Sequence, residues 1–192
     1  IIKKAAKVTP VVDGQNFKDV YLPWAFRYLR LHFSKLLNQK KYSFYCGSLQ
    51  IPLLDVVGEA ARSIQLADPY FVTKIPMTFE SPKRLKTFIK MASPLLQKRR
   101  IRKSLVSDFS ISKLKKFPLL KSFLNSDIYV GNENNLSLID LEHLNGKDVV
   151  VDVLGPTLES RLSQAGVRRV FVCLPQVENR PLVNFSILEA LI

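Results

Sequence analysis

The sequence predicts an α/β fold with a mainly parallel sheet, Rossmann-like or flavodoxin-like, and helices on both faces. Two observations predict this fold. Short runs rich in β-branched and aromatic residues alternate along the chain with segments of helical periodicity, as a parallel sheet with covering helices requires. The run 148–155, DVVVDVLG, is apolar almost throughout, which is typical of a strand buried on both faces.

Residues 1–68 are expected to form the first part of this domain as two strand–helix units. The β-branched run 7–14 ends in Asp-Gly, a turn signal, and predicts a strand. Apolar residues at helical spacing predict a helix over 17–38. The aromatic run 42–48 predicts a second strand, and the segment 51–65, which has a proline near its start, predicts a second helix.

Residues 126–192 are expected to complete the domain with three strands, at 126–133, 148–155 and 168–175. The segment 156–166 begins with proline and ends with glycine, the usual boundary residues of a helix. Because this connection is short, we expect the last two strands to be neighbours that are joined by a right-handed crossover.

The segment 69–125 breaks the alternation and is interpreted as an inserted basic helical arm. Much of the net charge of +13 lies here, since thirteen Lys or Arg stand against the single acid Asp108 between positions 81 and 121. Apolar and basic residues fall on opposite faces of a predicted amphipathic helix, which Pro94 should kink or break. The basic residues of the arm are Lys83, Arg84, Lys86, Lys90, Lys98, Arg99, Arg100, Arg102 and Lys103.

Charge concentrated in one segment suggests an anionic partner. An apolar face beside a basic face fits an anionic membrane surface. Nucleic acid fits the arm less well, because large aliphatic residues rather than exposed aromatic ones are interleaved with the charges. Alternatively, Leu85, Phe88 and Ile89 pack on the body or on a second subunit, so that an oligomer forms or the lysines are only solvated. We favour packing, and burial of the apolar face distinguishes it from docking.

Polar residues follow several predicted strands, and ligands of an open parallel sheet bind beyond the carboxyl ends of its strands. We therefore expect a small anionic ligand there. Gly155 also leads into a helix N-terminus, whose N–H groups favour an anion, although a plain strand–helix turn explains it more simply. The candidate ligand-binding residues from this pattern are Asp13, Gly14, Gly47, Ser48, Gly131, Asn132 and Gly155.

Several classes of site are missing from the sequence. There is no GxGxxG or GxxxxGK[ST] motif, so we expect no tight binding of NAD or NADP and predict no particular cofactor. The two cysteines and two histidines have no metal-ligand spacing. A cytoplasmic protein, with peripheral membrane contact as a variant, is expected. The chain lacks an initiating Met and stops inside the apolar run NFSILEALI, so we expect a piece of a longer protein.

The stretch VTPVVDGQNFKD, at 8–19, resembles VTPVVDGSGLKDTLE in a bacterial family whose members often carry the name quinate or shikimate 5-dehydrogenase. YCGSLQIPLLDVVGEA stands where that family has a strand ending SGVDR, and ENRPLVNFSILEA resembles its GRSFGTNVMEA. The resemblance covers most of the chain and implies a glycine-rich α/β region upstream. The site positions that it implies are Asp13, Gly14, Lys18, Gly47, Gly131, Arg180 and Asn184.

The chain departs from that family at two strand ends. Leu49 replaces the aspartate after SGV, and Asn132 replaces the aspartate after a later strand glycine. The loss of two carboxylates weakens an acid–base or metal role there. The sequence therefore leaves open whether the chain is an enzyme. It predicts a ligand-binding α/β protein related to these dehydrogenases, or alternatively a non-enzymatic module whose basic arm docks on an anionic membrane or nucleic acid.

Overall fold

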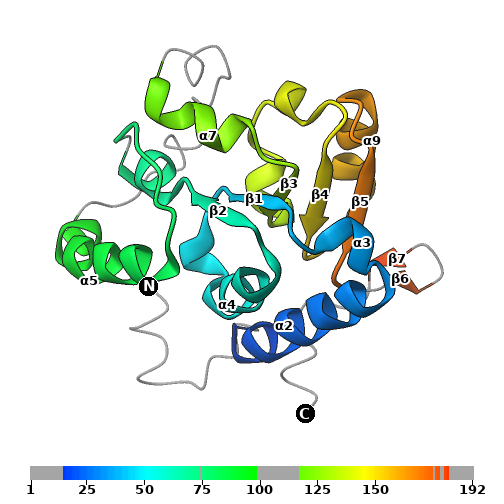
Figure 1. Cartoon of the computed structure of the whole chain (residues 1–192), viewed down its shortest axis with the longest axis horizontal. Coiled ribbons are helices and arrows are strands. Elements are labelled where there is room, and N and C mark those ends of the chain that lie inside the picture. Colours follow the sequence, from blue (N-terminus) through cyan, green and yellow to red (C-terminus); the bar gives the residue numbers. More distant parts are fainter. Residues whose placement is uncertain (1–14, 74, 99–116, 175, 178–179, 182–192) are drawn as a thin grey trace.

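The structure is a computed structural model that describes residues 15–73, 75–98, 117–174, 176–177 and 180–181 (Figure 1). Its centre is a five-stranded sheet with the order β2-β1-β3-β4-β5, in which every neighbouring pair is parallel. The order is that of flavodoxin-like folds, so the predicted α/β fold is confirmed. The strands are β1 (Lys41–Phe44), β2 (Ser63–Leu66), β3 (Ile128–Gly131), β4 (Asp148–Val151) and β5 (Arg169–Val172).

Helices cover both faces of this sheet. On one face, α2 (Gln15–His32), α4 (Ile51–Ala60) and α5 (Pro82–Lys98) contribute Phe26, Leu54 and Leu85 to a core cluster that includes Phe44. On the other face, α7 (Lys121–Leu124), α8 (Glu133–Leu136) and α9 (Pro156–Gln164) pack around a second cluster that contains Tyr45 and Tyr129. Figure 1 shows α2 and α4 together below the sheet and α9 at the upper right, next to β5. The strands are therefore buried from both sides.

Short elements complete the architecture. They are α3 (Ser34–Leu37), the 3₁₀ turns η1 (Gly47–Leu49), η4 (Pro118–Leu120) and η5 (Glu142–Leu144), the π turn η2 (Pro69–Thr73), and the antiparallel pair β6 (Gln176–Val177) and β7 (Arg180–Pro181). The predicted helix over 17–38 is interrupted at Phe33, which has a non-helical ψ of 37°. The predicted strand over 7–14 lies outside the described residues.

The second predicted helix was wrong in its last part. It ends at Ala60 rather than continuing to position 65, and β2 follows almost at once. Val57, Ala60 and Ile64 keep helical spacing, so periodicity alone continued the helix. In the structure, Ala61 is extended at φ −75° and ψ 145°, and Ile64 and Leu66 are buried in β2. Pairing with β1 therefore overrode the local pattern.

The segment predicted as an arm connects β2 to β3, and its first part lies on the body. Phe79 forms an isolated antiparallel bridge with Leu66 of β2. Leu85 of α5 is fully buried in the first core cluster. Pro94 does not break α5, which continues to Lys98.

Candidate functional site

The carboxyl edge of the sheet is where all five parallel strands end. Gly47 and Ser48 follow β1, while Gly131 ends β3 and Asn132 comes next. The strand order reverses between β1 and β3, and in open α/β sheets ligands bind at this switch point. Gly47 and Gly131 therefore lie at one edge, as expected. Both also serve packing, since a Cβ on Gly131 would come within 2.9 Å of Leu136.

Asp68, the second residue after β2, closes the turn that follows β1. Its Oδ2 accepts a hydrogen bond from the Gly47 amide at 2.9 Å, and its Oδ1 accepts one from the Ser48 amide at 2.8 Å. The residue is 1% exposed. Burial raises the pKa of Asp68, although the hydrogen bonds from Ser48 and Gly47 partly oppose this rise. The carboxylate of Asp68 thus accepts hydrogen bonds from two backbone amides that could otherwise bind an anionic ligand.

Two further carboxylates, those of Asp152 and Glu133, organise the ends of β3 and β4. Asp152 Oδ2 accepts from Lys18 Nζ of α2 at 2.7 Å, while its Oδ1 accepts from the Glu133 amide at 3.0 Å. Glu133 Oε1 in turn accepts from the Gly155 amide at 2.9 Å. A Cβ on Gly155 would overlap Glu133 Oε1, which explains the glycine. The start of α9 therefore already carries the anion that a helix N-terminus favours.

Side chains from the two sides of the switch point meet. The side chain of Asn135 in α8 lies close enough to the Cys46 thiol, after β1, to lower its pKa in part. Burial raises the pKa of Cys46 to about 12, with a smaller contribution from the charge of Asp68. Burial likewise raises the pKa of Cys173, after β5, to about 12. Both sulfurs are thiols at neutral pH, and a thiolate is the reactive form.

A buried polar group lies next to the switch point on the second face of the sheet. Tyr45 and His143 share a hydrogen bond of 2.5 Å between the phenol oxygen and Nε2, and Tyr129 packs edge-on against the same imidazole. Burial lowers the pKa of His143 to about 4, although the nearby Asp140 raises it in part. The imidazole is therefore neutral at pH 7 and joins η5 to the end of β1.

The candidate residues from the sequence fall into three groups. Gly47, Ser48, Gly131 and Asn132 come together at the switch point. Lys18 and Gly155 also lie at this edge, where Lys18 donates a hydrogen bond to Asp152 and the Gly155 amide donates one to Glu133. The remaining candidates cannot be placed as side chains, because Asp13, Gly14 and Asn184 lie outside the described residues and only the backbone of Arg180 is described.

Sequence reasoning missed the carboxylates that organise this edge. Asp68 was missed because β2 was assigned to a helix, although an acid directly after SIQLA, where polar and apolar residues alternate, is itself a strand-end signal. Asp152 was missed because the strand was extended to position 155, whereas β4 ends at Val151. Asn135 gives no signal in the sequence, since it meets Cys46 only after folding.

The described half of the basic arm favours packing over docking. Leu85 is fully buried, and Phe88 and Ile89 pack against the first core cluster. Lys83, Arg84 and Lys90 are exposed, and Lys86 pairs with Asp55 at 2.9 Å. Side chains beyond Met91 in α5, and all of 99–116, are not described, so the roles predicted for Lys98, Arg99, Arg100, Arg102 and Lys103 stay predictions.

An open groove of about 500 Å³ runs along α5. Its lining residues are Phe79, Ser81, Lys83, Arg84, Thr87, Phe88 and Met91. Within the described parts of the chain, no helix is both long and apolar enough to cross a membrane. Nor do three or more His, Cys, Asp or Glu side chains gather to hold a metal ion among the residues that the structure places.

Fold and site together define an α/β protein with an open, all-parallel sheet of flavodoxin-like order, whose carboxyl edge is cross-linked by its own carboxylates. The chain belongs to the family described as Domain of unknown function (DUF8754), whose model matches residues 16–192. No curated protein and no solved structure matches the chain. The relation to quinate or shikimate dehydrogenases stays a prediction.

Proposed function

We propose that this protein binds a small polar ligand at the carboxyl ends of β1 and β3. The observation that carries the proposal is the reversal of strand order between these two strands, where open parallel sheets place their ligands. Asn135, in α8 after β3, supports it with a partly exposed side-chain amide on one side of this point. Ser48, in η1 after β1, is also partly exposed and adds a hydroxyl group on the other side.

Charge narrows the chemistry of the proposed ligand. Asp68, Glu133 and Asp152 supply three carboxylates at this edge, against the single ammonium group of Lys18 among the residues discussed. Carboxylate oxygens have acceptor capacity beyond one hydrogen bond each. We therefore propose a ligand that presents several hydroxyl donors. An anionic group, as expected from the sequence, would be accepted at the Gly155 amide at the expense of Glu133.

The neutral imidazole of His143 and the protonated thiols of Cys46 and Cys173 limit the reactions that this protein could catalyse. A thiol with a pKa of about 12 is a poor nucleophile at neutral pH. The amides of Gly47 and Ser48 donate to Asp68, so a pyrophosphate would have to compete with that carboxylate. We therefore propose binding rather than a defined reaction, and dehydrogenase activity is a separate proposal that rests on the resemblance alone.

Saturation-transfer NMR tests this proposal with matched probes. Shikimate and quinate combine hydroxyl groups with one carboxylate, and methyl shikimate retains the hydroxyl groups without the charge. We expect transfer to the hydroxylated probes, and a loss of transfer in Ser48→Ala and Asn135→Ala. Ser160→Ala, on the exposed side of α9, is the matched control. An absence of transfer to all three probes, or an equal loss in the control, would contradict the proposal.

The groove along α5 supports a second candidate, in which the basic arm docks on an anionic membrane surface. Lys83 and Arg84 lie beside Phe88 and Met91 in this groove, a combination that suits a lipid headgroup and the start of its chain. Co-sedimentation with vesicles that contain or lack phosphatidylserine tests it. We expect charge-dependent binding that weakens in Lys83→Gln/Arg84→Gln, and binding without dependence on lipid charge would exclude this candidate.

A further inference from the structure

The amino edge of the sheet, opposite the candidate site, carries basic residues at the start of four strands. We call this set the amino-edge row, and it consists of Lys40, Lys41, Arg62, Lys147, Arg168 and Arg169. Backbone hydrogen bonds hold these positions next to one another across the sheet. The Arg62 amide donates to the Lys40 carbonyl at 2.9 Å, and the Arg168 amide donates to the Lys147 carbonyl at 2.8 Å.

The two halves of the row are joined through β3. The Asp127 amide donates to the Lys41 carbonyl at 2.9 Å, and the Asp148 amide donates to the Asp127 carbonyl at 3.2 Å. Neighbouring strands lie about 4.8 Å apart, so the row extends about 19 Å from β2 to β5. The basic side chains are thus arranged by the backbone of the sheet and not by a mobile loop.

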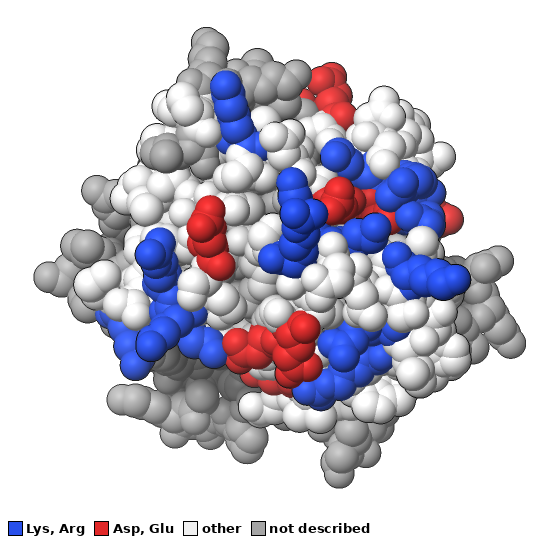
Figure 2. Space-filling view, viewed as in Figure 1, with Lys and Arg blue, Asp and Glu red and all other residues white. Residues whose placement is uncertain are grey.

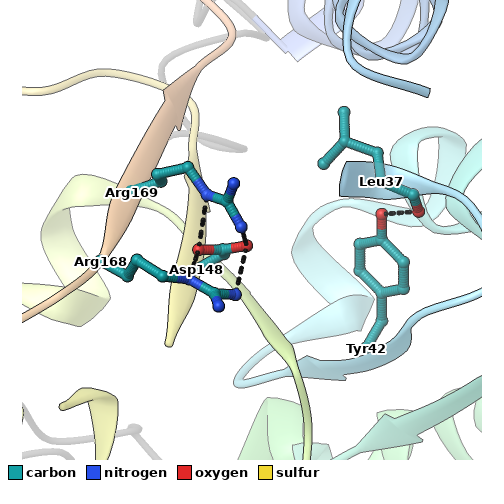
Figure 3. A network of polar contacts seen from close by, with 5 residues as sticks. All are labelled: Leu37, Tyr42, Asp148, Arg168 and Arg169. Carbon is teal, nitrogen blue, oxygen red and sulfur yellow. Dashed lines mark hydrogen bonds and ion pairs between the residues drawn. The ribbon is translucent and has the colours of Figure 1, made fainter. Parts of the chain in front are cut away.

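Positive charge remains in excess after the local ion pairs are formed. Asp148 accepts two hydrogen bonds from Arg168, at 2.9 and 3.0 Å, and two from Arg169, at 3.1 and 2.8 Å (Figure 3). One carboxylate therefore serves two guanidinium groups. The side chain of Asp148 is 2% exposed, whereas those of Arg168 and Arg169 are 54% and 36% exposed. The cations face solvent while their shared anion is buried.

Six cations stand against two acids, Asp127 and Asp148, in the row and the strand starts between them. Figure 2 shows Lys and Arg side chains across the region that β1, β4 and β5 occupy in Figure 1, around a smaller acidic group. Helix C-termini favour nearby cations, which accounts for Arg62 after α4 and Arg168 after α9. That effect does not account for Lys147, which follows a single 3₁₀ turn, or for Arg169.

The chemistry of this edge selects among polyanionic partners. None of the large apolar side chains that the structure shows as exposed belongs to 38–41, 61–63, 125–128, 145–148 or 166–169. Insertion into lipid and stacking on unpaired bases both need such side chains. A duplex backbone needs only cations, and one strand of a duplex presents a phosphate about every 3.4 Å along the axis. The row is long enough to meet several phosphates.

We propose that the amino-edge row binds the phosphate backbone of double-stranded nucleic acid without reading its sequence. This surface lies at the opposite edge from the proposed ligand site, and none of its residues belongs to the basic arm. Phosphate contacts by Lys and Arg give affinity that falls steeply with salt. With three to four contacts, affinity should fall about 100-fold between 50 and 200 mM salt.

Fluorescence anisotropy with a labelled duplex DNA of about 20 base pairs tests this proposal over a salt series. The variant Lys41→Gln/Arg62→Gln/Lys147→Gln removes three charges and leaves the Asp148 pairs intact. The control Lys83→Gln/Arg84→Gln/Lys90→Gln removes three exposed charges from α5. We expect the first variant to lower the log–log salt slope by about 3 and the control to leave it almost unchanged.

Four results would overturn the proposal. The first is that the unaltered protein does not bind the duplex at 50 mM salt. The second and third are that both triple variants lose duplex binding equally, or that the α5 control alone loses it. The fourth is that the row variant loses binding to anionic vesicles while its duplex binding persists. Equal loss would indicate a diffuse effect of net charge. Thermal unfolding checks that both variants fold. Where the row variant does not fold, the single change Arg62→Gln at an exposed position is compared with Arg84→Gln by the same criteria.

Discussion

Replacing His143 should remove a specific part of the acid sensitivity of this protein. Burial holds the pKa of His143 near 4, against 6.5 for an exposed histidine. The unfolded chain therefore binds more protons than the folded chain between these values, and stability falls as pH falls through this window. A full shift of this size corresponds to about 3 kcal/mol, of which about 2 kcal/mol is lost between pH 7.5 and 5.

Urea unfolding at pH 7.5 and pH 5 measures this contribution in the unaltered protein and in His143→Gln. Glutamine does not titrate, and its amide oxygen can accept from the Tyr45 hydroxyl. We expect the unaltered protein to lose about 2 kcal/mol more than the variant between the two pH values. His32 is exposed and present in both proteins, so its contribution cancels in the comparison.

Equal pH dependence of the two proteins would refute this argument. It would mean that the imidazole is not buried in a neutral form beside Tyr45. A variant that is less stable by the same amount at both pH values would show a loss of packing without the titration.

Further predictions follow from the same contacts. Asp148→Asn should lower the free energy of unfolding by about 2 kcal/mol in a urea titration, because both guanidinium groups lose their shared carboxylate while water still reaches them. Gly155→Ala should cost about 1–3 kcal/mol in the same assay, since the new Cβ overlaps Glu133, and Glu133→Ala should restore part of the loss. Cys173, which is 4% exposed, should react with a disulfide-exchange reagent at pH 7.5 only on unfolding, and prompt labelling of both cysteines would contradict its burial. Calorimetry should detect no micromolar binding of NAD or NADP, because the turn after β1 donates its amides to an internal carboxylate.

The elements that were predicted well are those for which the local sequence pattern alone indicates the conformation. The run 148–155 is almost wholly apolar, and burial on both faces is the usual reason for such a run, so β4 was found with its true start. The Pro156 and Gly166 boundaries located α9 in the same way. The strand β2 was missed because its apolar spacing continues that of α4, and only pairing with β1 decides between the two conformations.

The candidate site was predicted in position but not in composition. Polar residues after apolar runs located the switch point, since parallel strands must end at one edge. The role of Asp68 depends on a hydrogen bond to amides 20 and 21 residues earlier in the chain, and that of Asp152 on Lys18, 134 residues away. Contacts over such separations follow from strand order, which no local pattern encodes.

The pairing of Phe79 with Leu66 has a consequence for how copies of this chain meet. The Leu66 amide donates to the Phe79 carbonyl at 2.7 Å, and the Phe79 amide donates back at 2.9 Å. β2 is an edge strand of the sheet. The outward-facing N–H and C=O groups of its Leu66 are therefore already hydrogen-bonded within the same chain. The unpaired N–H and C=O groups of an edge strand can pair with a strand of another molecule, and this pairing leads to aggregation. A two-residue contact thus removes one point on that flank at which a strand of another copy could pair with β2.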